Sequence, residues 1–167
     1  MDLYVLRHGV ADEWDWHKYP NDDERPLTLE GMDKLARQVR GLNALGLALD
    51  LMITSPLVRA AQTAEIVRDG LASPGRLAMS NALTPKAHPY LLLEELRGKH
   101  ASVGKVMVVG HEPHLSSFVS MVVSGDLTGL IRLKKGALCK LRLVSLDGAR
   151  CGWLQWLMTP DQMIMLA

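Results

Sequence analysis

Short apolar runs alternate along the chain with longer segments whose apolar residues recur every three or four positions. The short runs are typical of strands buried in a parallel sheet, and the longer spacing is typical of helices that cover such a sheet. Strands are predicted at residues 2–6, 49–55, 76–80 and 105–110, and helices at residues 27–46, 57–70, 89–98 and 113–125. This alternation predicts an α/β fold with a mainly parallel sheet flanked by helices on both faces.

The helix predicted at residues 27–46 carries its own start and stop signals. Thr28 is a candidate N-cap, because its side chain can accept a hydrogen bond from the first turn, and helices commonly end at a glycine such as Gly46. The next helix follows Ser55-Pro56, a pair typical of helix starts. The face of the first helix that is expected to be buried consists of Leu29, Met32, Leu35, Val39 and Leu42.

The last part of the chain predicts an antiparallel hairpin. Two apolar segments, 137–144 and 150–158, flank Asp147-Gly148, a dipeptide favoured in two-residue turns. The hairpin is therefore expected to add antiparallel strands at one side of the sheet.

The hairpin register bears on the two cysteines of the chain. It places Cys151 opposite Val144 and Cys139 opposite Trp156, so the cysteines do not face each other. Reduced, partly buried thiols are expected instead of a disulfide. Two cysteines without metal-ligand spacing also argue against a zinc site.

Composition and charge narrow the class of protein. The chain has 167 residues, 48% of them apolar, which is enough for a sizeable core, and a single domain over residues 1–167 is expected. The net charge is +1 with both signs interspersed, which argues against nucleic-acid binding. The sequence shows no signal-peptide pattern and no apolar run of membrane-spanning length, so a soluble, cytoplasmic protein without a membrane partner is expected.

Polar residues of one chemical kind stand where three predicted strands end. Arg7 and His8 follow the first strand, His111 follows the fourth, and Arg59 lies in the first turn of the helix after the second strand. The carboxyl ends of parallel strands lie at one edge of the sheet, so these four residues should gather there. Two guanidiniums, two imidazoles and the adjacent helix N-termini predict a site for a phosphoryl group.

Each of these residues also has an ordinary structural explanation when it is taken alone. His8 could be a core histidine with satisfied hydrogen bonds, and His111 could cap a strand. Arg7 could be an ion-pair partner at a strand end, and Arg59 a solvated helix residue. The occurrence of all four at one edge of the sheet favours a functional site.

Arg7-His8-Gly9 resembles the signature tripeptide of the histidine phosphatase superfamily, also called the phosphoglycerate-mutase-like superfamily. The resemblance continues in order through almost the whole chain, in "RPLTLEG", "TSPLVRAAQTAE", "VMVVGHEPHLSSFV", "LKKGALCKL" and "WLQWLMTP". The length and these motifs look most like the SixA-type phosphohistidine phosphatases. The resemblance implies a three-layer fold with a mixed sheet between helices, in agreement with the periodicity.

The resemblance also implies roles for the residues at the sheet edge. The histidine that matches His8 accepts the phosphoryl group, and the residues that match Arg7, Arg59 and His111 hold its oxygens, with Gly9 in the same binding set. A neutral imidazole is a competent nucleophile near neutral pH, and planar, permanently charged guanidiniums suit phosphoryl oxygens. Because no carboxylate cluster has metal-binding spacing, neither a metal nor another cofactor is expected.

The sequence departs from the wider superfamily after the third strand. Mutases and phosphomonoesterases of the superfamily usually carry an acid there that protonates the leaving alkoxide, but this chain has no carboxylate between Ser80 and Glu94. An imidazole leaves more easily than an alkoxide, since its protonated form has a pKa near ~6.5. The expected reaction is removal of phosphate from phosphohistidine on a signalling protein, without a metal and through a phosphohistidine enzyme intermediate.

Two alternatives remain open on the sequence alone. A phosphomonoesterase of the same superfamily would act on a small phosphorylated substrate and would need a substitute acid, whereas a non-catalytic phosphate-binding module would not need His8. The candidates for a substitute acid are Asp12, Glu13, Glu112 and His114.

Further residues are expected to border the site. Arg25 is a candidate for phosphate binding, although an exposed loop arginine is an equal alternative. Segment 11–25 is acidic and is either a solvated excursion or a docking surface for a protein substrate. Its aromatic residues are Trp14, Trp16 and Tyr19, and Lys134-Lys135-Gly136 is a second candidate border of the site.

Overall fold

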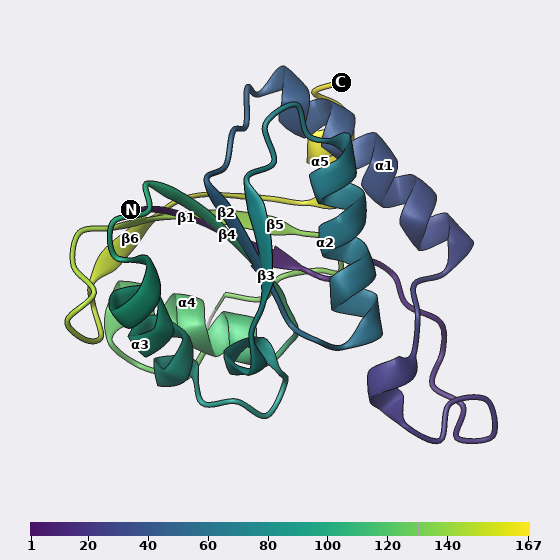
Figure 1. The fold of residues 1–167 in the computed structure, drawn as a ribbon, viewed down its shortest axis with the longest axis horizontal. Coiled ribbons are helices and arrows are strands. Elements are labelled where there is room, and N and C mark those ends of the chain that lie inside the picture. The colour runs from purple at the N-terminus through teal and green to yellow at the C-terminus, as the bar shows by residue number, and fades with distance from the viewer. Residues whose placement is uncertain (130) are drawn as a thin grey trace.

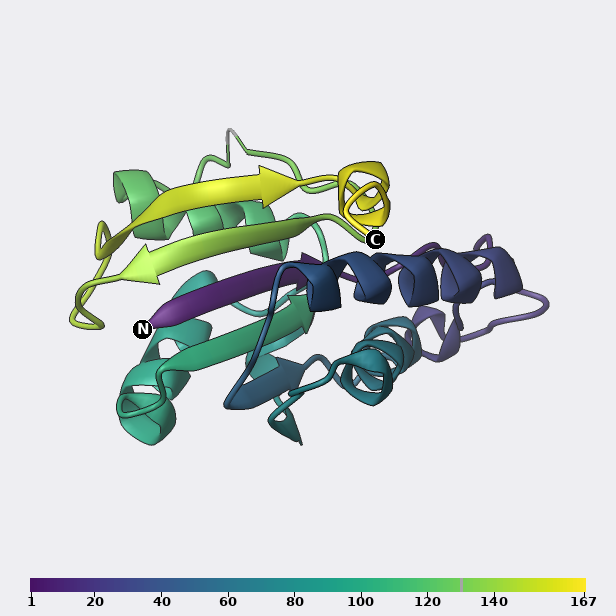
Figure 2. The same ribbon diagram turned by 90° about the horizontal axis from the view of Figure 1, so that it is seen from above.

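The centre of the computed structural model, which describes residues 1–129 and 131–167, is a six-stranded sheet between two layers of helices (Figure 1). The strand order is β3-β2-β4-β1-β5-β6. The strands are β1 (Asp2–Arg7), β2 (Leu51–Thr54), β3 (Arg76–Met79), β4 (Lys105–Gly110), β5 (Leu138–Leu143) and β6 (Gly152–Met158). The first four run parallel, β5 is antiparallel to β1, and β6 is antiparallel to β5. Figure 2 shows this hairpin at one edge of the sheet, as the sequence predicts.

Helices cover both faces of the sheet. The helices are α1 (Leu29–Ala44), α2 (Val58–Gly70), α3 (Pro89–His100), α4 (His114–Ser124) and α5 (Pro160–Ile164), with short 3₁₀ helices η1 (Asp22–Glu24) and η2 (Asn81–Leu83). In Figure 1, α1, α2 and α5 lie on one side of the sheet and α3 and α4 on the other, which confirms the predicted three-layer architecture. No helix in the described ranges is long and apolar enough to cross a membrane.

Alternate residues of the central strands supply two separate cores. In β1, Leu3 and Val5 pack on the side of α3 and α4, whereas Tyr4 and Leu6 pack on the side of α1, α2 and α5. All four side chains are buried. Burial on both faces explains why the parallel strands are continuous apolar runs in the sequence.

The ends of α1 agree with the prediction, but its buried face differs at one residue. Thr28 caps the helix by accepting a hydrogen bond from the N–H of Gly31, and Gly46 ends it with a left-handed φ of 67°. Leu29 is 84% exposed, so its predicted burial is wrong. At about 100° of rotation per residue, Leu29 lies far around the helix from Leu35, which faces the sheet.

The hairpin forms, but its turn and part of its register differ from the prediction. Residues 144–151 connect the strands, in place of a two-residue turn. A register shift beside Lys140 leaves Gln155 unpaired and places Cys139 opposite Leu157, not opposite Trp156. A one-residue bulge of this kind inserts an extra residue into one strand and cannot be read from alternation alone.

The fate of the cysteines agrees with the prediction. Both Cys139 and Cys151 are free and buried. Burial raises the pKa of the Cys139 thiol to about 12, so this side chain behaves as a small apolar core residue.

The same glycine-to-alanine substitution is expected to have opposite effects on stability at two helical glycines. A Cβ on Gly41 would lie 1.8 Å from the Met163 carbonyl oxygen where α5 packs on α1, whereas a Cβ on the exposed Gly98 of α3 meets nothing. Gly41→Ala should therefore destabilise the fold by about 1–3 kcal/mol, and Gly98→Ala should stabilise it by about 0.5–1 kcal/mol. Urea unfolding measures both; a stabilising Gly41→Ala would contradict the packing of α5 on α1.

Candidate active site

His8 stands directly after β1 with a fixed tautomer. Its Nδ1 lies 2.8 Å from the carbonyl oxygen of Gly9. A carbonyl can only accept, so Nδ1 carries the proton and donates, and the lone pair of the neutral ring is on Nε2. The backbone is also fixed, because the His8 N–H donates to the Gly110 carbonyl at 3.0 Å.

Gly9 joins the end of β1 to the helices. Its N–H donates to Thr63 Oγ1 at 3.0 Å, and the Thr63 hydroxyl donates to the Arg59 carbonyl at 2.7 Å. A Cβ on Gly9 would lie 2.7 Å from Cδ1 of Leu35 in α1. The glycine therefore permits close packing of the end of β1 against α1, and its N–H connects the same place to α2.

His111 follows β4 and lies next to His8. The centroids of the two rings are 5.1 Å apart, with an angle of 52° between the ring planes. His111 Nε2 makes a 2.9 Å hydrogen bond with Oγ of Ser55, which follows β2. Its Nδ1 is buried and has no hydrogen-bond partner in the described part of the chain.

Arg7 and Arg59 bring two guanidiniums to the same edge of the sheet. Arg7 Nη1 donates to the Leu133 carbonyl at 2.7 Å. Arg59, whose side chain is 5% exposed, donates from Nη1 to the Asp22 carbonyl at 2.8 Å and from Nη2 to Asp22 Oδ2 at 3.0 Å. The Nε atoms of both arginines are buried without a partner among residues 1–129 and 131–167. Buried unpaired donors are unfavourable in a stable fold, and they fit an anionic ligand.

Burial and the two positive charges keep both imidazoles neutral. Burial lowers the pKa of His8 from 6.5 to about 3; the hydrogen bond to Gly9 opposes this shift, and the charges of Arg59 and Arg7 add to it. Burial is the largest cause that lowers the pKa of His111 to about 2, and the nearby His8 and Arg59 lower it as well. Burial also lowers the pKa of Arg59, but a guanidinium keeps its charge in proteins. The site thus combines neutral imidazoles with fixed positive charge.

Comparison with known proteins identifies the family. A family model described as the histidine phosphatase superfamily (branch 1) matches residues 3–79. An uncharacterized protein of Picosynechococcus sp. is 34% identical over 143 residues, which cover 85% of each chain. The chain belongs to the histidine phosphatase superfamily. The phosphohistidine phosphatase SixA of Escherichia coli is 26% identical over 166 residues, covering 99% of this chain and 98% of SixA.

A solved structure extends the similarity to the fold. The protein histidine phosphatase SixA complexed with tungstate superimposes with a TM-score of 0.83 at 27% identity, covering 96% of this chain and 98% of that chain. The phosphoglycerate-mutase-like fold inferred from the motifs is thereby confirmed. This histidine phosphatase superfamily member is a phosphatase, and the edge of the sheet that carries Arg7-His8-Gly9 is its candidate active site.

The structure brings together the four residues that the sequence placed at the sheet edge, namely Arg7, His8, Arg59 and His111. Arg25 is linked to Arg59 through Asp22. Its Nε donates to Asp22 Oδ1 at 2.8 Å, and its Nη1 donates to the Asp12 carbonyl at 2.7 Å. The two carboxylate oxygens of Asp22 thus contact Arg25 and Arg59, a bridge that the sequence reasoning missed. The only signal was the acidic run before Arg25, which does not reveal a contact with a residue 37 positions away.

The predicted substitute acids lie in different surroundings. Asp12 accepts hydrogen bonds from Lys18 and Tyr19, and Glu13 is exposed. Glu112 accepts a hydrogen bond from Ser116 and lines, with Arg7, a pocket of about 440 Å³. Burial lowers the pKa of His114 to about 4, which leaves a neutral ring. None of these four makes a hydrogen bond to Arg7, His8, Arg59 or His111 within the described residues.

Two observations complete the electrostatic description. The exposed Lys135 contributes a positive charge that lowers the pKa of His8, so the predicted lysine border does act on the site. The described residues contain no group of three or more histidine, cysteine, aspartate or glutamate side chains that could hold a metal ion.

The positive charge of Arg59 is expected to lower the pKa of His8. In the wild type, the His8 ring should stay neutral well below pH 6.5, and Arg59→Ala should raise its pKa, because a neighbouring positive charge is removed and burial is relaxed. Histidine ring NMR titration measures the pKa. Arg68→Ala removes an exposed arginine from the same helix and serves as the control; an equal rise in both variants would contradict the assignment.

Proposed function

We propose that the protein removes phosphate from phosphohistidine through a phosphorylated His8. The proposal depends on one observation: a neutral His8 with its Nε2 lone pair free stands beside two guanidiniums, while no carboxylate occurs in residues 81–93 after β3. The site therefore holds a nucleophile and oxyanion donors without the acid that an alcohol leaving group needs.

In the first step, the lone pair of His8 Nε2 attacks phosphorus as the P–N bond of the substrate breaks. The substrate ring is protonated on its other nitrogen, so the bonding electrons return to the ring and neutral imidazole leaves. Charge on the three equatorial phosphoryl oxygens is stabilised by Arg7 and Arg59, whose Nε donors are unpaired in the protein. The hydrogen bond from Nδ1 to Gly9 supports the positive charge that His8 acquires on phosphorylation.

In the second step, water attacks phosphorus and the bond to His8 Nε2 breaks. The electron pair returns to Nε2, so the ring becomes neutral again with its proton still on Nδ1. The two protons of water remain with the phosphate, and no external acid is required for the atoms and charges to balance. We assign to His111 a contact with a phosphoryl oxygen during both steps, because its Nδ1 is buried without a partner in the described chain.

Similarity supports this choice of reaction class. SixA of Escherichia coli is a phosphohistidine phosphatase and aligns with nearly the whole chain. The SixA structure with 27% identity was solved with tungstate, a tetrahedral oxyanion like phosphate. A site that offers arginine donors at one edge of the same fold fits an anion of this shape.

A substrate panel with a chemical quench tests the reaction. With EDTA present throughout, the wild type should hydrolyse phosphohistidine protein and phosphoramidate faster than sugar or glycerate phosphates, because imidazole and ammonia leave more readily than alkoxides. Labelled substrate quenched in alkali should leave acid-labile label on the protein. Arg59→Ala should lower the rate about 10²–10³-fold, as expected for losing one oxyanion donor.

Two results would contradict the proposed reaction. Label that persists in folded His8→Ala would place the intermediate elsewhere. Faster turnover of phosphomonoesters than of every phosphoramidate would favour the phosphomonoesterase alternative.

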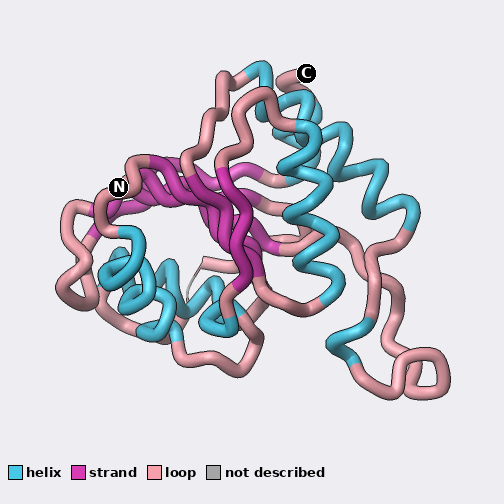
Figure 3. The backbone as a smooth tube through the Cα atoms, viewed as in Figure 1, coloured by secondary structure: helices cyan, strands magenta, loops and turns pink. Residues whose placement is uncertain are grey.

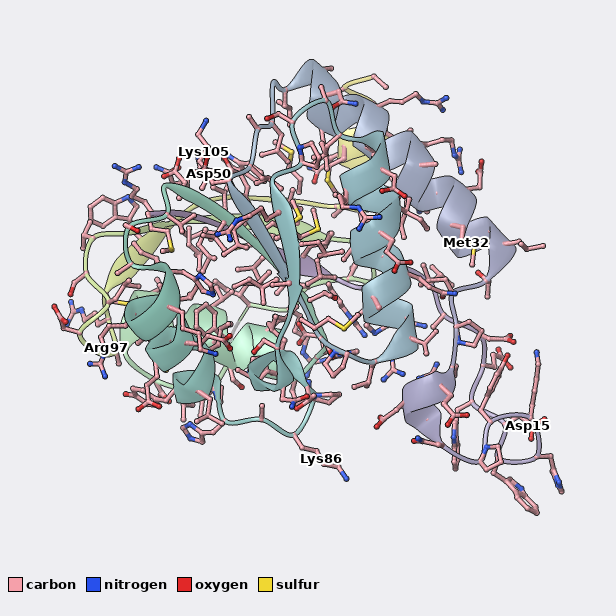
Figure 4. All side chains as sticks on the ribbon, in the orientation of Figure 1. Asp15, Met32, Asp50, Lys86, Arg97 and Lys105 are labelled. Carbon is pink, nitrogen blue, oxygen red and sulfur yellow. The ribbon has the colours of Figure 1, made fainter. Side chains whose placement is uncertain are left out.

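The segment that precedes Arg25 supports a protein substrate in place of a free metabolite. Figure 3 shows the chain between β1 and α1 extending away from the body as loops with one short helix. Trp14 and Trp16 are 61% and 62% exposed on this segment. Figure 4 shows Asp15, the residue between them in the sequence, far from the sheet. Asp22 connects the segment to Arg59, so a protein that docks on these aromatics would reach the site.

The docking hypothesis predicts a selective effect on KM. Trp14→Ala with Trp16→Ala should raise KM several-fold for a phosphohistidine protein and leave phosphoramidate turnover unchanged, because the small substrate does not touch the segment. Trp153→Ala removes a comparably exposed tryptophan (53%) from β6 and is the matched control. An equal change for both substrates in the double variant would contradict docking.

A further inference from the structure

A pocket of about 510 Å³ is lined by Asp22, whose carboxylate contacts Arg59. One wall is formed by η1 and the other by the segment after η2, and the lining includes Asp22, Asp23, Leu57, Thr84, Pro85 and Lys86. Leu57 is the N-cap of α2, whose first turn holds Arg59. The pocket is therefore linked to Arg59, which is proposed to bind the phosphoryl oxygens, through Asp22 and through the start of α2.

Asp22 contacts both the arginine and the pocket. Its Oδ1 accepts from Arg25 Nε at 2.8 Å, its Oδ2 accepts from Arg59 Nη2 at 3.0 Å, and its backbone carbonyl accepts from Arg59 Nη1 at 2.8 Å. A carboxylate can accept about four hydrogen bonds, so two acceptor positions remain. The side chain is 43% exposed, and its orientation is set by two guanidiniums.

We propose that the Asp22 carboxylate accepts a hydrogen bond from the protonated imidazole ring of the phosphohistidine substrate, and that this ring occupies the pocket. The inference rests on the proposed function, because it names the binding place of the group that leaves when His8 takes the phosphoryl group. Asp22 is thereby the residue that selects imidazole over an alcohol as the leaving group.

The chemistry of the leaving ring requires no proton transfer at the moment of cleavage. A phosphohistidine ring that is protonated on the nitrogen away from phosphorus carries a positive charge. When the P–N bond breaks, its electron pair stays on the ring nitrogen, and neutral imidazole is released. A carboxylate that accepts from the distant N–H stabilises this reactive, protonated form of the ring.

The same carboxylate disfavours a phosphate monoester. Burial raises the pKa of Asp22. Hydrogen bonding with Arg25 and the charges of Arg59 and Arg25 lower it by more than burial raises it, so the pKa of Asp22 is below its usual value. Asp22 is therefore ionised near neutral pH and cannot protonate an alkoxide. The leaving oxygen of a phosphate monoester has no hydrogen to donate to this carboxylate, whereas the distant N–H of a protonated ring does.

The remaining groups of the pocket are consistent with a cationic ring. Asp23 adds a second exposed carboxylate of the same sign. Lys86 is exposed, and Figure 4 shows its side chain directed away from the body of the protein. Thr84 and Pro85 form the opposite wall in the segment where relatives in the wider superfamily are expected to carry their acid. The carboxylate thus comes from the other side of the pocket.

Comparison of two substrates separates this role from the effect of Asp22 on Arg59. The values of kcat/KM are measured for N-phosphorylimidazole and for p-nitrophenyl phosphate, whose leaving group needs no proton. Asp22→Asn weakens the contact that orients Arg59, and this effect should slow hydrolysis of both substrates alike. Loss of the charge-assisted hydrogen bond should add a decrease of about tenfold or more for N-phosphorylimidazole alone.

Matched variants make the result decisive. Glu24→Gln removes the same charge from the same 3₁₀ helix outside the pocket lining, and should leave the substrate ratio unchanged. Asp22→Ser is the second variant for the ratio if Asp22→Asn does not fold. An equal loss on both substrates, in an enzyme whose wild type prefers N-phosphorylimidazole, would overturn this inference alone. A wild type that hydrolyses only the ester would overturn the proposed function as well.

Discussion

Two arginine side chains held at one buried edge of the sheet are the constraint on which the rest of the site depends. Arg59 is almost fully buried and Arg7 is half-buried, and each leaves a buried Nε without a partner in the described structure. Charge in such a place acts over short distances with little screening. The positive charge of the two arginines helps to keep His8 neutral, and the charge of Arg59 is paired with Asp22. The unpaired Nε donors remain available for an oxyanion.

The sheet supplies the rigidity that this arrangement needs. Parallel pairing of β1 with β4 and of β4 with β2 brings the chain ends after Arg7, Gly110 and Thr54 to one edge. His8 and Ser55 continue that alignment through backbone hydrogen bonds to Gly110 and Val109. A separate core on each face prevents the strands from shifting, so His8 and its neighbours are fixed before any ligand arrives.

What could be predicted from the sequence follows from local periodicity and strand ends. Apolar runs locate the parallel strands, and the first polar residues after them, Arg7, His8 and His111, must lie at one edge whatever the loops do. Asp22 could not be found in this way, because its contact with Arg59 depends on how segment 11–25 folds back onto α2. The bulge at Gln155 likewise leaves no trace in the alternation of β6, and Leu29 belongs to an apolar repeat yet rotates away from the sheet.

The site is also a place where stability is given up for chemistry. An unsatisfied buried donor costs about 1–3 kcal/mol, and Arg7, Arg59 and His111 each hold an unpartnered buried nitrogen in the described chain. In the proposed reaction, a phosphoryl group removes this penalty and spreads its charge over the same donors. Because the donors are already desolvated and oriented, little reorganisation is left for the reaction itself. The unfavourable electrostatics of the unpaired donors and the proposed affinity for an oxyanion therefore have the same physical origin.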